Sequence, residues 1–167
     1  MISFKYKGIF IRIDFSFLVF NALIFLVRDS RFILEFYTAC AVHEAGHIIA
    51  LEMTGGSISG VVLSGAGIRI DTRRNVLDTC RSSLFVLAAG PAVNLIMYVL
   101  FRSCGGAFPV INLTLALYNL LPFRSLDGGA MIALFTVGTS FERTAELILS
   151  AVKLLIIATA LAVVWFM

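Results

Sequence analysis

The sequence is poor in charged residues, which a soluble domain needs on its surface. Only 14% of its 167 residues are charged, against roughly a quarter in an average soluble domain, whereas 60% are hydrophobic and the mean hydropathy is +1.00. A chain this apolar cannot cover its core with polar side chains in water, and it has too much apolar surface to stay disordered. The composition therefore predicts a polytopic membrane protein, with residues 1–167 forming one membrane-embedded domain.

Cysteine pairs, basic clusters and a signal-peptide cleavage site are also missing. The three cysteines form no Cys-x-x-Cys pair, which excludes a disulfide framework and an all-thiolate zinc site. No cluster of Lys and Arg is interleaved with aromatic residues, so no nucleic-acid partner is expected. No small-x-small cleavage site follows the first apolar run, so this run is interpreted as a retained membrane anchor.

Apolar runs predict an all-α polytopic membrane fold with about five transmembrane helices. The runs cover residues 15–27, 32–53, 84–101, 110–137 and 145–167. The first is short, since 13 helical residues rise only ~20 Å against a hydrocarbon core of ~30 Å. Gly90-Pro91 interrupts the third run. Pro122 and Asp127-Gly128-Gly129 break the fourth, which predicts a discontinuous helix with its freed backbone groups facing protein or a cavity.

Two polar segments show the alternation of short strands. Residues 4–14 alternate weakly around Gly8, and residues 68–71 alternate within the glycine-rich stretch 55–79. This pattern predicts short amphipathic β-strands at the membrane interface.

The distribution of Lys and Arg predicts a cytoplasmic N-terminus. With five spans, the loops on the N-terminal side hold eight basic residues and the opposite loops hold three, which places the N-terminal side inside. The inner set is Lys5, Lys7, Arg12, Arg69, Arg73, Arg74, Arg81 and Arg143, and the outer set is Arg28, Arg31 and Arg102.

Both histidines of the chain fall in the segment His43-Glu44-Ala45-Gly46-His47. Residues four apart share a helix face, so both imidazoles can bind one tetrahedral Zn²⁺. Glu44 can reach a reacting water without being a ligand, and HExxH is a general zinc-protease signature. The alternative is a pair of hydrogen-bonded core histidines, but it would leave Glu44 in the bilayer without a partner. The sequence therefore predicts one Zn²⁺ per chain.

The third zinc ligand must be a carboxylate or a cysteine, because the chain has no third histidine. Candidates within the apolar runs are Glu35, Cys40, Glu52 and Asp127. Glu35 lies two turns before His43, too far along the helix axis to share the metal. Cys40 lies one turn away and is geometrically possible. Asp127 is favoured, because a broken helix and the glycines after it let a short side chain approach closely.

Three motifs together resemble those of the site-2 proteases, which are intramembrane zinc metalloproteases. They are HExxH at 43–47, GPxxN at 90–94 and NxxPxxxxDG at 119–128, in order on the second, third and fourth runs. The resemblance covers about residues 37–131 and implies a three-helix catalytic core within about 32–138. The chain looks like a minimal member without PDZ or CBS domains, most similar to the branch that releases membrane-tethered sigma factors in sporulating bacteria.

The resemblance implies a role for each matching position. The two histidines and Asp127 would bind zinc, and Glu44 would be the general base. Asn94 and Asn119 would hold the substrate backbone or the oxyanion. For Asn94, a packing hydrogen bond between helices is the alternative. The family also implies an active site reached from the cytoplasmic side.

The sequence therefore predicts an intramembrane zinc metalloprotease of the bacterial cell membrane. Its substrate would be a membrane-anchored protein, cleaved within or near its transmembrane segment, as in regulated intramembrane proteolysis. Besides the lipid bilayer, a regulatory membrane protein or a second copy of the chain is a further expected partner. Two alternatives stay open: a zinc or cation transporter, which needs polar residues on both sides of the site, and a catalytically silent relative, which has no need of Glu44.

Overall fold

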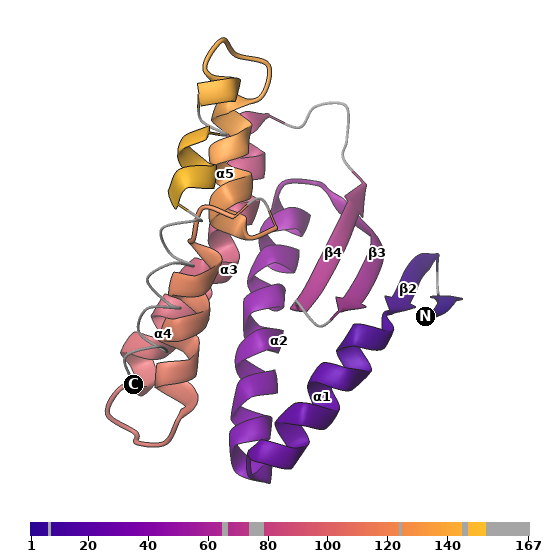
Figure 1. Ribbon diagram of the computed structural model, residues 1–167, viewed down its shortest axis with the longest axis vertical. Helices are drawn as coiled ribbons and strands as arrows, with labels where there is room; N and C mark the ends of the chain where they lie inside the picture. Colours follow the sequence, from indigo (N-terminus) through magenta and orange to yellow (C-terminus); the bar gives the residue numbers. More distant parts are fainter. Residues whose placement is uncertain (7, 65–66, 74–78, 124, 145–146, 153–167) are drawn as a thin grey trace.

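Helices make up most of the computed structural model, which describes residues 1–6, 8–64, 67–73, 79–123, 125–144 and 147–152 (Figure 1). The helices lie beside one small sheet, so the mostly helical fold with short strands is confirmed. The elements are β1 (Ile2–Tyr6), β2 (Ile9–Ile13), α1 (Phe15–Val27), α2 (Ser30–Met53), β3 (Ser57–Ser64), β4 (Gly67–Arg73), α3 (Cys80–Phe101), α4 (Phe108–Asn119) and α5 (Asp127–Thr136).

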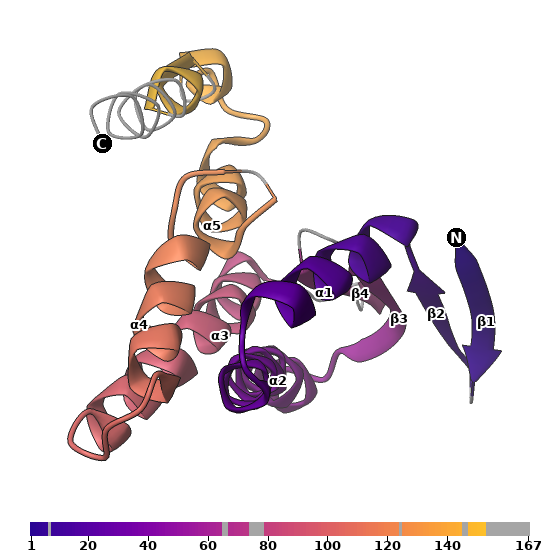
Figure 2. The ribbon, with the colours of Figure 1, turned by 60° about the horizontal axis from the view of Figure 1, so that its bottom comes forward.

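Helix α3 is the centre of the helical part. It packs against α2, α4 and α5, and α2 also contacts α4 (Figures 1 and 2). Both long helices begin at a capping side chain: Asp29 accepts a hydrogen bond from the Phe32 N–H (3.1 Å), and Thr79 accepts one from the Ser82 N–H (3.2 Å). Gly90-Pro91 interrupts the apolar run without breaking the helix, because α3 runs through Pro91.

The break in the fourth run is confirmed. Helix α4 ends at Asn119 and α5 begins at Asp127. Hydrogen bonds inside the connecting turn, from the Phe123 N–H to the Leu121 carbonyl (2.8 Å) and from the Leu126 N–H to the Phe123 carbonyl (2.8 Å), satisfy freed backbone groups. A Cβ at Gly128 would overlap the Leu120 carbonyl oxygen, so a glycine is needed where α5 starts against the end of α4.

Both predicted strand segments exist, and they form one four-stranded sheet in the order β1-β2-β3-β4. The outer pairs are antiparallel, whereas β2 and β3 are parallel, a pairing that the sequence did not predict. A parallel pair needs a long crossover, which α1 and α2 provide. The sheet lies beside the C-terminal half of α2 (Figure 1). Strand β2 passes into α1 through Asp14 alone, whose N–H donates to the Leu63 carbonyl of β3 (2.9 Å).

The predicted number of spans stays a prediction. Among the described residues, α3 is the one helix that is both long enough and apolar enough to cross a bilayer. Helix α1 has 13 residues, and α4 and α5 have 12 and 10. The fifth run, at 145–167, falls mostly outside the described residues.

Candidate metal centre

Three donor atoms from two helices converge on one point. His43 and His47 lie one turn apart on α2, and Asp127 is the first residue of α5. The two Nε2 atoms are 3.1 Å apart, and Asp127 Oδ2 lies 3.3 Å from Nε2 of His43 and 3.2 Å from Nε2 of His47. Donors at 2.0–2.1 Å from a tetrahedral zinc ion lie roughly 3.3 Å from one another. The triangle therefore has the size that a zinc ion needs.

The outer nitrogens of both imidazoles are fixed by hydrogen bonds. His47 Nδ1 lies 2.8 Å from the Val86 carbonyl oxygen, which can only accept, so Nδ1 carries the hydrogen and Nε2 keeps its lone pair. His43 Nδ1 donates in the same way to Asn94 Oδ1 at 2.7 Å. Two lone pairs thus meet Asp127 Oδ2, which is buried without a hydrogen-bond donor. A cluster made only of acceptors fits a cation, and the outer hydrogen bonds are those typical of metal-binding histidines.

Glu44 lies beside the three donors without joining them. It follows His43 on α2, is half-buried, and lines the same cavity as the histidines. Its carboxylate interacts electrostatically with His43, His47 and Asp127. This arrangement is the one expected of a base that reaches a reacting water without binding the metal.

Two glycines bring α2 and α3 unusually close at this level. A Cβ at Gly90 would overlap His47 Nε2 and would come within 2.9 Å of His43 Cε1. On the facing helix, a Cβ at Gly46 would lie 2.9 Å from the Ala89 carbonyl oxygen. Small residues permit such close crossing of membrane helices. The glycine of GPxxN therefore makes room for the imidazoles.

Asn94 does not have the place expected of a substrate-binding residue. Its side chain is fully buried (0% exposed), and it is absent from the cavity wall. Its Oδ1 accepts from His43, and its Nδ2 donates to Asn112 Oδ1 (2.9 Å) and to the Ala39 carbonyl (3.4 Å). Both polar atoms of the side chain are thus bound within the protein. The hydrogen bonds between helices that the alternative expects are present, and one of their partners is the candidate ligand His43. A contact of Asn94 with substrate stays a prediction.

Asn119 is half-buried and lies on the wall of the cavity. Its Nδ2 donates to the Leu115 carbonyl one turn earlier in α4 (3.0 Å). The structure thus brings Asn119 to the cavity that the metal centre shares, and its contact with substrate stays a prediction.

The other candidate ligands lie apart from the centre. Cys40 lines the cavity, but the group of described residues that could hold a metal ion is His43, His47 and Asp127. The Glu35 carboxylate accepts hydrogen bonds from Arg31 Nε (3.0 Å) and from the Ala107 N–H at the start of α4 (2.9 Å). It therefore ties the first turns of α2 to α4. Glu52 is exposed at the end of α2.

The metal centre opens into a cavity of about 1600 Å³. Its walls come from all five helices and the sheet, and the apolar residues Phe17, Phe20, Val62, Ile68 and Ile70 take part in them. Pockets for small ligands are usually about 300–1,000 Å³. This cavity is larger than that range.

The sequence did not single out Asn112, which the structure joins to Asn94. Asn112 lies on α4, is fully buried (0% exposed), and binds Asn94. Its signal in the sequence is an amide inside an apolar run, seven residues before Asn119 and so on a similar helix face.

Comparison with known proteins finds a similar curated protein and a similar solved structure, although no family model matches the chain. A Synechocystis protein named "Putative zinc metalloprotease sll0528" is 28% identical over 109 residues, covering 58% of this chain and 28% of that protein. The chain thus spans less than a third of this curated relative. The solved structure of a site-2 protease from Methanocaldococcus jannaschii aligns with a TM-score of 0.68 and 21% identity, over 98% of this chain and 86% of that one. The predicted resemblance is therefore confirmed, and this chain has the fold of the site-2 proteases.

Proposed function

We propose that the chain is a zinc metalloprotease that hydrolyses a peptide bond within or near the transmembrane segment of a membrane-anchored protein. The observation that carries this proposal is the triangle of three donor atoms with Glu44 beside it, on the wall of a cavity large enough for a peptide. The fold of the archaeal site-2 protease and the likeness to a protein named as a zinc metalloprotease support it.

The side chains divide the chemistry between them. Nε2 of His43, Nε2 of His47 and Asp127 Oδ2 would hold the zinc ion. Zinc, when bound, supplies the Lewis acidity that polarises the scissile carbonyl and acidifies the reacting water. Glu44 takes the proton from that water as a general base and returns it to the leaving amine as a general acid. The apolar walls keep bulk water away from this proton transfer.

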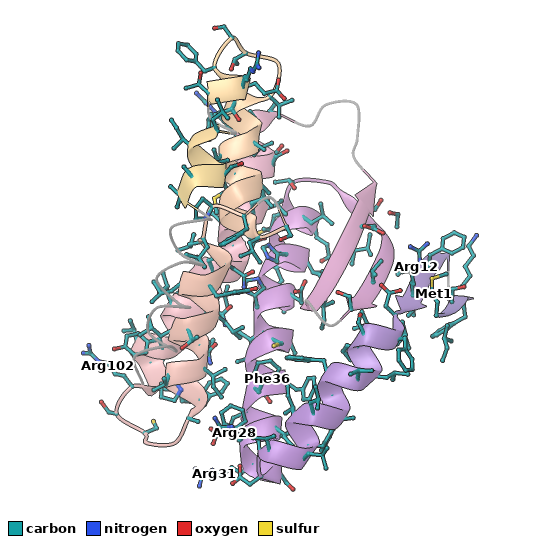
Figure 3. All side chains as sticks on the ribbon, viewed as in Figure 1. Met1, Arg12, Arg28, Arg31, Phe36 and Arg102 are labelled. Carbon is teal, nitrogen blue, oxygen red and sulfur yellow. The ribbon has the colours of Figure 1, made fainter. Side chains whose placement is uncertain are left out.

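The proposed membrane orientation puts the site nearer the cytoplasm. His47 lies six residues before the end of α2, which is ~9 Å along the helix axis. A cytoplasmic N-terminus puts this end of α2 on the inner side. Figure 3 shows Arg28, Arg31 and Arg102, the residues assigned to the outer side, in the lower part of the molecule, and Arg12 of β2 above them.

A zinc content of about one ion per chain, measured on the purified full chain in detergent, is the first expected result. Chelation should abolish cleavage of a co-expressed single-span substrate, and zinc should restore it. Asp127→Ala should weaken zinc binding by more than the 10–100-fold typical of outer-shell losses, because it removes a donor atom. Cys40→Ala is the matched control and should keep zinc.

Three other outcomes would each contradict part of the proposal. Zinc retained in Asp127→Ala but lost in Cys40→Ala would reverse the ligand assignment. Zinc flux into vesicles without cleavage would identify a transporter. Bound zinc with neither flux nor cleavage would identify a catalytically silent relative.

The edge of the sheet is the proposed docking place for substrate backbone. A substrate helix must unwind before its carbonyls can be attacked, and an extended segment can add to the free edge of a sheet. Strand β4 is an edge strand, and its Ile68 and Ile70 line the cavity. The edge and the metal centre therefore face the same space.

Proline substitutions test this docking place, because proline removes a backbone donor. Single substitutions Ile68→Pro and Ile70→Pro should lower cleavage more than ~10-fold, about the loss of one or two backbone hydrogen bonds, with zinc content unchanged. Phe4→Pro in β1, the opposite edge strand, is the control and should keep cleavage. Cleavage at the wild-type rate in both β4 variants would contradict the docking proposal.

A further inference from the structure

We infer that Asn112 is a positioning residue for the metal centre, which acts through Asn94 on the proposed ligand His43. These three side chains form an amide relay that runs from α4 through α3 to α2. The inference rests on the proposed zinc site and assigns a role to a residue outside its three motifs.

The amide relay is a continuous chain of short hydrogen bonds. His43 Nδ1 donates to Asn94 Oδ1 (2.7 Å), Asn94 Nδ2 donates to Asn112 Oδ1 (2.9 Å), and Asn112 Nδ2 donates to the Phe108 carbonyl (2.8 Å). Both asparagine side chains are 0% exposed. Bulk water therefore cannot replace a lost partner, and each buried polar group needs the one it has.

Only one orientation of the two asparagine amides satisfies every hydrogen bond of the relay. The Phe108 carbonyl can only accept, so Asn112 must turn its nitrogen there and its oxygen towards Asn94. That oxygen requires the nitrogen of Asn94, which leaves Asn94 Oδ1 facing His43. An acceptor at this place keeps the hydrogen of His43 on Nδ1, so Nε2 keeps the lone pair that binds zinc. Asn112 thereby selects the tautomer of a ligand that it does not touch.

Loss of Asn112 would leave the orientation of Asn94 weakly determined. Asn94 Nδ2 would keep one acceptor, the Ala39 carbonyl at 3.4 Å, which is longer than the usual N–H···O range of 2.7–3.2 Å. The Asn94 amide could then turn end for end and present its NH₂ group to His43. His43 would move its hydrogen to Nε2 and lose its donor atom for zinc. His47 is outside the relay, since its Nδ1 donates to the Val86 carbonyl.

The chain has only two histidines, so ¹⁵N-histidine labelling of the full chain in detergent gives a direct test. In the zinc-free wild type, at a pH where both imidazoles are neutral, both should show the Nδ1–H tautomer. Asn112→Leu should shift His43 towards Nε2–H, leave His47 unchanged as an internal control, and weaken zinc binding about 10–100-fold. Asn112→Asp should keep the Nδ1–H tautomer of His43 and the wild-type zinc affinity, because a carboxyl group accepts from Asn94 Nδ2 in either protonation state.

Thr114→Val is the matched control for the Leu variant. It removes a hydrogen bond to the carbonyl one turn earlier (2.8 Å), on the exposed face of the same helix, and should change neither reading. An Nε2–H tautomer of His43 in the wild type would overturn the inference, whether or not the Leu variant folds. So would an Asn112→Leu protein with wild-type tautomer and zinc affinity. If both histidines of the wild type show the Nδ1–H tautomer but the protein binds no zinc, the proposed function is contradicted and the relay is still supported.

Discussion

Replacing Glu44 by glutamine should leave zinc bound and lower peptide cleavage by about 10²–10⁴-fold, the usual contribution of a general base. Glutamine has nearly the same shape as glutamate but cannot accept the water proton at neutral pH. Glu44 supplies none of the three converging donor atoms, so the metal should stay bound. The measurement pairs zinc analysis with single-turnover cleavage of a detergent-solubilised single-span substrate, so that chemistry and binding are read separately.

Glu52→Gln is the control for this substitution. Glu52 lies on the same helix, is exposed, and does not line the cavity. The two variants remove the same charge from the same helix, so a difference between them reports position alone. Full activity in Glu44→Gln would exclude the proposed proton transfer, whereas loss of zinc in this variant would make Glu44 a ligand.

Gly90→Ala should strongly weaken zinc binding although it adds a single methyl group. The new Cβ would overlap His47 Nε2 and would come within 2.6 Å of His47 Cε1. Helices α2 and α3 cannot easily separate, because the hydrogen bonds of the two imidazoles to Val86 and Asn94 join them. Zinc affinity should fall by more than ~100-fold, beyond the range of outer-shell losses, because the overlap is with a donor atom. Isothermal titration with zinc measures this change.

Ala92→Val is the control for added volume on α3. Ala92 lies on the exposed face of the helix, two residues after Gly90, so a larger side chain there should leave zinc affinity unchanged. Circular dichroism of both variants separates local overlap from loss of the fold. Wild-type zinc affinity in Gly90→Ala would show that α2 and α3 can move apart at this level, and the close approach would then not be required.

The residues that carry local signals were predictable. Helical spacing put His43 and His47 on one face, and the turn-forming residues around Asp127 predicted the helix break that delivers the third donor. Alternation predicted the strand segments. These features depend on a few neighbouring residues, and the physics that creates them acts over the same short range.

Long-range features were not predictable from the same signals. The parallel pairing of β2 with β3 depends on how α1 and α2 return the chain. The side chain of Asn94 looks the same in the sequence whether it faces a cavity or a neighbouring helix, and only the placement of α4 decides between them. Asn112 is one amide in an apolar run, and its role requires knowing that Asn94 lies opposite.

The short junction between β2 and α1 couples the sheet to α1, which forms one wall of the cavity. Asp14 alone separates the strand from the helix, and its N–H is bound to Leu63 of the neighbouring strand. No residue of α1 is buried, so little packing resists a tilt of this helix. Such a tilt would move β2 with α1. The hydrogen bonds of β2 to β3 and of β3 to β4 would then carry the movement to the edge strand β4. A tilt of α1 would therefore change the width of the cavity and the position of that edge together.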